Sequence, residues 1–259
     1  MTAGRLNETK ARLLSAEDPH PVEVLNPDSD FPILLICEHA GQAVPERLDG
    51  LGISQHDLDA HVGWDIGAGS VARHMAELLG APVVLQRYSR LVIDCNRPPD
   101  SPGAIPEVSD GVQVPGNRAL GADGWQARVD EVFRPFHDTA NALFDARLRR
   151  ATFAIHSFTP VLGGVARPWD LGFLFRRDTR TSAILRDYLQ ARCPNLTIGM
   201  NEPYQIEDAS DWFVPRHGEA RGLPHSLIEI RNDKISDAAG QLAWAELLSD
   251  AITQFLKDN

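Results

Sequence analysis

Charged and amide side chains cluster in one short segment of the chain, SRLVIDCNRPPD, residues 89–100. Its apolar residues suit a buried strand, but Arg90 precedes them, and Asp94, Asn96 and Arg97 follow. A guanidinium group binds a carboxylate through two parallel hydrogen bonds. We therefore expect Arg97, helped by Asn96, to hold a substrate carboxylate, and Arg90 to face a developing oxyanion. Asp94 would orient one arginine; a purely structural Arg–Asp pair is the alternative.

Two histidines each come just after an apolar run that is typical of a strand: His39 after FPILLIC, and His156 after ATFAI. One such histidine is commonly structural, but two of them favour a shared metal. A catalytic zinc takes three protein ligands and leaves a fourth position for water. Asp65, in HVGWDIG, is the candidate third ligand, and Glu38 is the alternative; Asp65 could instead cap a helix. The expected cofactor is one divalent metal, zinc by its ligand types.

An acidic residue interrupts the apolar segment LIEIR, residues 227–231. A carboxylate in such surroundings must be paired or functional, because burying an isolated charge is costly. Beside a metal-activated water, Glu229 could act as general base. Arg231 points to the same face of a strand. It could neutralise Glu229, or it could be a further anchor for a substrate carboxylate.

Apolar runs that predict strands alternate along the chain with patterns that predict helices. The expected strands are 31–37, 81–87, 90–94, 151–158, 170–175, 195–200 and 225–231, and the expected helices are 65–80, 122–150, 181–192 and 240–257. This alternation predicts an α/β fold with three layers, a mostly parallel central sheet with helices on both faces. Ligands of such sheets bind at the carboxyl ends of the strands, where the candidate residues lie.

The chain shows no internal repeat and no clear linker. We expect a polar N-terminal segment over residues 1–30 and a single α/β hydrolase domain over residues 31–259. Residues 98–118, rich in Pro, Gly, Ser and Asp, predict a long loop, which in a compact domain is often functional.

Composition excludes several classes of function. A formal net charge of −11 argues against nucleic acid and anionic membranes as partners, because both require a basic surface. Three cysteines without CxxC spacing argue against a disulfide framework, and we expect Cys37 and Cys95 to be buried thiols. No apolar run reaches the roughly 18 residues that a membrane-spanning helix needs. We expect a cytoplasmic protein.

Two other functions remain open on these residues. One is a metal-free serine hydrolase that uses Ser157, although no GxSxG motif surrounds that serine. The other is a non-catalytic protein that binds an acidic amino-acid derivative.

Six short segments, in order along the chain, resemble the N-formylglutamate amidohydrolase family. They are CEHAGQAVP (37–45), HVGWDIGA (61–68), SRLVIDCNRP (89–98), IHSFTP (155–160), NEPY (201–204) and LIEIRND (227–233). The resemblance implies metal-assisted hydrolysis of N-formyl-L-glutamate to formate and glutamate, a step of histidine degradation. The substrate would then be a small anionic N-acyl amino acid.

The same resemblance implies a fold similar to zinc carboxypeptidases and to the aspartoacylase and succinylglutamate desuccinylase group. Those relatives use an Asn–Arg pair for a carboxylate, an arginine for the oxyanion and a strand-borne glutamate as base. The corresponding residues here are Asn96 with Arg97, Arg90 and Glu229, and His39 and His156 match the metal-binding histidines in order. The relatives' HxxE ligand pair is absent. Glu38 stands where better-known family members carry a proline, which indicates a divergent branch.

Overall fold

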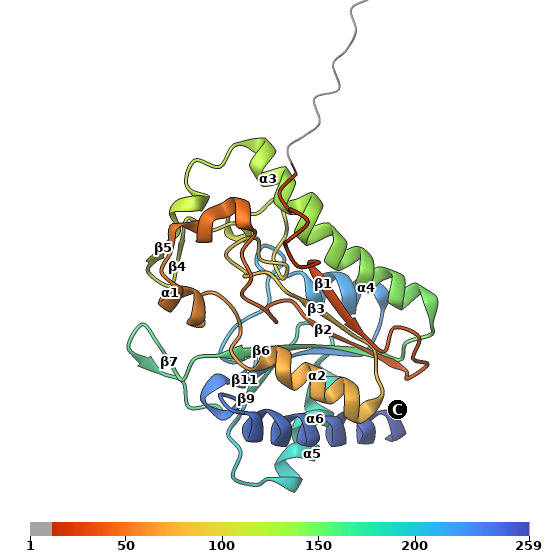
Figure 1. The fold of residues 1–259 in the computed structure, drawn as a ribbon. Coiled ribbons are helices and arrows are strands. Elements are labelled where there is room, and N and C mark those ends of the chain that lie inside the picture. The colour runs from red at the N-terminus through yellow and green to blue at the C-terminus, as the bar shows by residue number, and fades with distance from the viewer. Residues whose placement is uncertain (1–11, 259) are drawn as a thin grey trace, which may run out of the picture.

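The computed structural model describes residues 12–258, and within them a seven-stranded central sheet has the order β1-β3-β2-β6-β11-β9-β10 (Figure 1). The strands are β1 Val22–Leu25, β2 Ile33–Cys37, β3 Val83–Gln86, β6 Ala151–Phe158, β9 Leu171–Leu174, β10 Ile198–Met200 and β11 His225–Arg231. Neighbouring strands are parallel, except that β1 is antiparallel to β3, and β11 to β9. The central strands are buried on both faces, which explains their continuous apolar sequences.

Helices cover both faces of this sheet, as the sequence predicted. The helices are α1 Gln55–Asp59, α2 Ala68–Leu79, α3 Ala122–Arg128, α4 Arg134–Ala146, α5 Thr179–Arg192 and α6 Ala238–Asp258. Helices α2, α5 and α6 lie on one face, and α3 and α4, joined by a π-helical turn, lie on the other (Figure 1). Each face has its own apolar core: Leu35 of β2 packs toward α2 and α6, whereas Leu34 and Ile36 pack toward α4. The predicted three-layer α/β class is confirmed.

Strand β1 lies inside the segment that the sequence suggested was only polar. Its residues pair antiparallel with β3, so residues 22–25 form one edge of the central sheet. The strand is short, carries Glu23 and is only partly buried, and therefore it lacks the strong apolar signal of the inner strands. Residues 1–11 of the expected polar segment lie outside the described residues.

Two small hairpins stand outside the central sheet. One is formed by β4 Val108–Ser109 and β5 Val112–Gln113, within the predicted long loop, and the other by β7 Val161–Leu162 and β8 Val165–Ala166. Cys37 and Cys95 are buried free thiols, as predicted. No helix within residues 12–258 is long and apolar enough to cross a membrane.

The strand predicted at residues 90–94 is wrong, because these residues form a buried loop of turns. Leu91 and Val92 are fully buried, but their backbone carbonyls accept hydrogen bonds from side chains and not from a neighbouring strand. Asn117 Nδ2 donates to Leu91 O at 2.9 Å, and Arg128 Nη1 donates to Val92 O at 2.9 Å. A short apolar sequence therefore indicates burial, but it does not distinguish a strand from a buried loop whose backbone is hydrogen-bonded by distant side chains.

Arg128 is expected to be a main source of this loop's stability. Its side chain is 1% exposed and also donates to Asn117 Oδ1 at 2.6 Å and to Gly116 O at 3.1 Å. Arg128→Met keeps much of the apolar stem but leaves three buried acceptors without this donor. Because each such loss costs about 1–3 kcal/mol, we expect the free energy of unfolding, measured in urea, to fall by about 3 kcal/mol or more.

The matched control is Arg134→Met at the start of α4. Arg134 is more than half exposed, and within residues 12–258 its ion-pair partner is Asp130 alone. Its replacement should therefore change the free energy of unfolding by no more than about 0.5 kcal/mol. Equal effects of the two substitutions would show that the Arg128 hydrogen bonds do not stabilise the loop.

Candidate active site

Three ionisable side chains stand in a row across the carboxyl ends of β2, β6 and β11. Glu229 of β11 is the register partner of His156 on β6, and Ile36 of β2 is the partner of Ala154. Two residues beyond Ile36, Glu38 therefore reaches His156, with 2.9 Å between Oε2 and Nε2. Side chains two residues apart on a strand share a face, which explains why these strands bring the three groups together.

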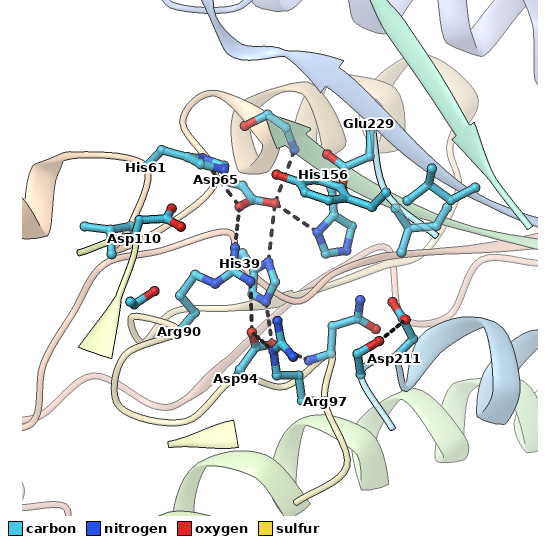
Figure 2. Close-up of a pocket in the computed structure, with 18 of the residues that line it drawn as sticks. His39, His61, Asp65, Arg90, Asp94, Arg97, Asp110, His156, Asp211 and Glu229 are labelled. Carbon is cyan, nitrogen blue, oxygen red and sulfur yellow. Dashed lines mark hydrogen bonds and ion pairs between the residues drawn. The ribbon is translucent and has the colours of Figure 1, made fainter. Parts of the chain in front are cut away.

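A buried His–Asp–His group occupies the centre of the site (Figure 2). Asp65 Oδ2 lies 3.3 Å from His39 Nδ1 and 2.9 Å from His156 Nδ1. All three residues are at most 2% exposed, and one donor atom from each lies within 4.8 Å of the others. The backbone N–H of Ser157 also donates to Asp65 Oδ2, at 3.2 Å. This group could bind a metal ion.

Asp65 is not the cap of the helix that follows it. Helix α2 has Gly67 at its N-cap position, in the left-handed region with φ 81°, and no side chain caps the helix. A Cβ at Gly67 would lie 2.2 Å from the carbonyl oxygen of Ile235, so only glycine fits this turn. The Asp65 carboxylate is therefore free to face the two histidines.

The Nε2 atom of each histidine, on the side of the ring away from Asp65, lies close to a second carboxylate. His39 Nε2 lies 2.7 Å from Asp94 Oδ1, and His156 Nε2 lies 2.9 Å from Glu38 Oε2. Metal-binding histidines characteristically donate their other N–H to such a carboxylate, which leaves the inner nitrogen for the metal. Two imidazoles and one carboxylate also match the ligand types of zinc. Glu38 thus lies behind His156, and the geometry favours Asp65 over Glu38 as the third ligand.

Electrostatic coupling within the group is strong. Burial alone would lower the pKa of His156, but its hydrogen bonds to Asp65 and Glu38 raise that pKa well above its ordinary value. Burial would raise the pKa of Asp65, but His39 and His156 hold it well below its usual range. Hydrogen bonds from the two histidines to Asp65 therefore hold the group together, and binding of a divalent cation would require deprotonated ligand atoms.

Glu229 extends into the same site from β11. Its side chain is buried, and no donor among residues 12–258 reaches its Oε2. Burial raises the pKa of Glu229 to about 7. Such a carboxyl group is suited to taking and returning a proton near neutral pH.

Arg231 does not neutralise Glu229. Its guanidinium group pairs with Asp233 at 2.8 Å and with Asp170 at 3.4 Å, and it also donates to backbone carbonyls. It is absent from the lining of the central cavity. The structure thus places Arg231 in a network at the end of β11, away from the other predicted site residues.

Asp94 orients both arginines of the buried loop. Its Oδ2 lies 2.9 Å from Arg90 Nη2 and 3.3 Å from Arg97 Nε (Figure 2). Arg90 Nη1 also lies 3.3 Å from Asp65 Oδ1, so Arg90 is held between two aspartates. Both Nη atoms of Arg97, by contrast, have no acceptor among the described residues, and its side chain is 37% exposed. Arg97 can therefore receive an anion.

Asn96 is fixed beside Arg97 by the backbone of another segment. Its Oδ1 accepts from the N–H groups of Trp212 and Phe213 at 3.2 and 2.9 Å. The carboxamide nitrogen is consequently directed away from these donors and is left for another acceptor. Asn96 and Arg97 together offer the donors that the sequence suggested for a carboxylate.

These groups line one cavity of about 250 Å³, sized for a small molecule. Its lining includes the predicted residues His39, Asp65, Arg90, Asn96, Arg97, His156 and Glu229. Four other ionisable residues of the lining were not predicted from the sequence: His61, Asp110, Tyr204 and Asp211. His61 and Tyr204 lie within the segments HVGWDIGA and NEPY, so those segments contained the signal, but nothing in the sequence distinguished these two residues.

Ser157 also lines the cavity but lacks the partner that a nucleophilic serine needs. Its Oγ donates to the carbonyl oxygen of Ile66 at 2.9 Å, and no histidine among the described residues bonds it. A serine nucleophile requires a base within hydrogen-bond reach. The geometry therefore gives no support to a serine hydrolase.

Comparisons with known proteins show the family and the fold to which this chain is similar. A family model described as N-formylglutamate amidohydrolase matches residues 31–236. A gene product of Agrobacterium tumefaciens has a crystal structure similar to this chain, with TM-score 0.88 and 36% identity over 94% of this chain and 99% of that one. N-formylglutamate amidohydrolase from Ralstonia eutropha shares the fold, with TM-score 0.68 and 18% identity over 92% of this chain and 98% of that one. No match is found among curated protein sequences.

Proposed function

The chain belongs to the N-formylglutamate amidohydrolase family and is a hydrolase that acts on amides, and from this premise we propose that it is metal-dependent and cleaves the N-acyl group of an acidic amino acid. N-formyl-L-glutamate is the substrate we propose to test first, with formate and glutamate as products. The observation that carries the proposal is the buried carboxyl group of Glu229, whose Oε2 has no partner among the described residues, in the same cavity as the His39–Asp65–His156 group.

His39, Asp65 and His156 are the proposed metal ligands, and zinc is the proposed metal. When bound there, zinc would supply Lewis acidity, which polarises an amide carbonyl and makes water more acidic. Asp94 and Glu38 orient the two histidines from behind. Replacement of either carboxylate should therefore weaken metal binding without removing a ligand.

The remaining chemistry falls to side chains of the cavity. Glu229 takes a proton from the attacking water and returns it to the leaving amine. Arg90 stabilises the oxyanion as negative charge develops on the acyl oxygen. Arg97 and Asn96 bind a carboxylate of the substrate and so orient the amide toward Glu229.

Formate release from N-formyl-L-glutamate by the purified protein tests this function. We expect a chelator to abolish turnover and stoichiometric zinc to restore it. The reason is that three protein ligands would leave a catalytic zinc a fourth position for water or substrate. Formate would be measured with a coupled dehydrogenase, and bound metal by mass spectrometry. Turnover that persists after the metal is removed would contradict metal dependence, and absence of turnover on N-formyl and N-acetyl amino acids alike would contradict the proposed reaction.

A further inference from the structure

Three arginines within residues 12–258 are buried without a carboxylate within 4.0 Å: Arg128, Arg149 and Arg167. Two of them are occupied by oxygen acceptors of the chain itself. Arg128 donates to two backbone carbonyls and to Asn117, and Arg149 donates to the carbonyls of Ser29 and Phe31 at 2.9 and 2.7 Å. These two arginines hold the backbone, and among their nitrogens Nε of Arg128 stays buried without a partner in the described residues.

Arg167 differs from both because most of its donors are unused. Its side chain lies at the base of the β7–β8 hairpin, and the residue is 8% exposed. Nη1 donates to the Tyr204 hydroxyl at 3.0 Å, and its two contacts with Thr159 are 3.5 Å long. No acceptor within the described residues bonds Nε or Nη2. Neither nitrogen is fully enclosed, so an anion that enters from solvent can reach both donors.

Tyr204 connects this arginine to the cavity. The Arg167 guanidinium carbon lies 4.9 Å from the centre of the Tyr204 ring, and Tyr204 lines the cavity together with Glu229. Because the Tyr204 hydroxyl accepts from Arg167, its own hydrogen is left to donate to another group. Burial, reinforced by Glu229, raises the pKa of Tyr204 to about 12, so the hydroxyl keeps that hydrogen at neutral pH.

The other fixed charges of the cavity limit where an anion can bind. Arg90 is held between Asp65 and Asp94 and is the proposed donor to the acyl oxygen, so it is not assigned to a substrate carboxylate. Asp110 and Asp211 add negative charge to the lining. Two positions then favour an anion: Arg97 on the loop that precedes α3, and Tyr204 backed by Arg167. The two positions come from segments far apart in the sequence and offer separate sets of donors.

We propose that Tyr204 and Arg167 form a second anion-binding subsite of the cavity, which takes one carboxylate of a substrate whose other carboxylate binds Arg97. Tyr204 makes the contact through its hydroxyl, and Arg167 positions that hydroxyl and supplies the charge. The inference rests on the proposed amidohydrolase function and assigns the residues that hold the second carboxylate of its acidic substrate.

Kinetics with three substrates test the assignment: N-formyl-L-glutamate and its two monoamides, in which either the α- or the side-chain carboxylate is a carboxamide. The wild type should lose about 10- to 100-fold in kcat/KM on each monoamide, the scale of a hydrogen bond to a charged group. Arg167→Gln should erase the preference for one carboxylate, and Arg97→Gln should erase the preference for the other. Tyr204→Phe, which keeps the ring under Arg167, should reproduce the Arg167→Gln pattern.

Arg186→Gln is the matched control, because Arg186 lies on α5 and bonds its neighbour Asp187. It should leave all three kcat/KM values unchanged. An equal loss on all three substrates in both Arg167→Gln and Tyr204→Phe would overturn the subsite. So would the finding that Arg97 and Arg167 select the same carboxylate.

Calorimetry with ligands that cannot be hydrolysed tests anion binding at the subsite independently of the proposed reaction. Glutarate has the carboxylate spacing of glutamate, and butyrate lacks one of the two groups. The zinc-loaded wild type should bind glutarate at least tenfold more tightly than butyrate, and Arg167→Gln should bind the two equally. This result without turnover of any formyl amide would uphold the subsite and reject the proposed function, whereas turnover without a glutarate preference would reject the subsite.

Discussion

Replacing His39 with alanine is expected to abolish both bound zinc and amidohydrolase activity while the protein stays folded. The substitution removes one of three proposed ligands from a group whose donor atoms lie within 4.8 Å of one another. Its outer partner Asp94 keeps Arg90 at 2.9 Å and Arg97 at 3.3 Å, so no unpaired charge remains buried. Zinc stoichiometry by mass spectrometry and the circular dichroism spectrum would be measured on the same sample.

His156→Ala should remove the metal equally but with a larger loss of stability. Glu38 is fully buried, and His156 is its hydrogen-bond partner among the described residues. Without that partner a buried carboxylate is left uncompensated, which typically costs about 3–5 kcal/mol. Both variants should lose zinc, but only His156→Ala should also lose much of the free energy of unfolding. The comparison therefore shows that His156 supports the fold in addition to binding the metal.

The control for both is His74→Ala on α2. His74 is partly exposed and lies 3.6 Å from Glu77, which is itself largely exposed. This variant should keep zinc, activity and fold. Stoichiometric zinc in purified His39→Ala would refute the assignment of His39 as a ligand.

The inner strands of the fold were predictable from the sequence because their apolar signal is continuous. β2 and β6 are buried on both faces, so each sequence is apolar for almost its whole length. The carboxyl-end rule then placed His39 and His156 at one edge of the sheet. The meeting of these histidines could therefore be predicted without knowledge of any distance.

The choice between Asp65 and Glu38 could not be predicted in the same way. Both are acidic and both lie near a histidine, but they bond different histidine nitrogens: Asp65 bonds Nδ1 of His156 and Glu38 bonds Nε2. That difference depends on ring orientation, which residue spacing does not encode. It also gives Glu38 a structural role, because its carboxylate orients His156.

Contacts between loops that are distant in the sequence could likewise not be predicted from it. Arg167 and Tyr204 are 37 residues apart in a hydrogen bond that only the tertiary fold creates. Arg231, which a two-residue period placed beside Glu229, is instead drawn toward Asp170 and Asp233 at the end of its strand. The two-residue period of a strand therefore predicted the side-chain direction within β11 but not the partner of its last residue, Arg231, which bonds acceptors in neighbouring loops.

Glu229→Gln is expected to leave zinc bound and to lower kcat by about 100-fold or more. The substitution keeps the shape of the side chain but removes the group that takes a proton from water, and loss of a general base typically costs a factor of about 10²–10⁴. Glu229 supplies no predicted ligand atom, so the metal content should be unchanged.

The fold should also be unchanged, because Glu229 Oε2 bonds no donor among the described residues, and a neutral amide costs less to bury than a carboxylate. The measurements are kcat for formate release, zinc content and the urea midpoint, with the exposed Glu246→Gln on α6 as control. A near-normal kcat in Glu229→Gln would leave Glu229 without a role as base. A loss of zinc together with kcat would show instead that Glu229 belongs to the metal-binding group.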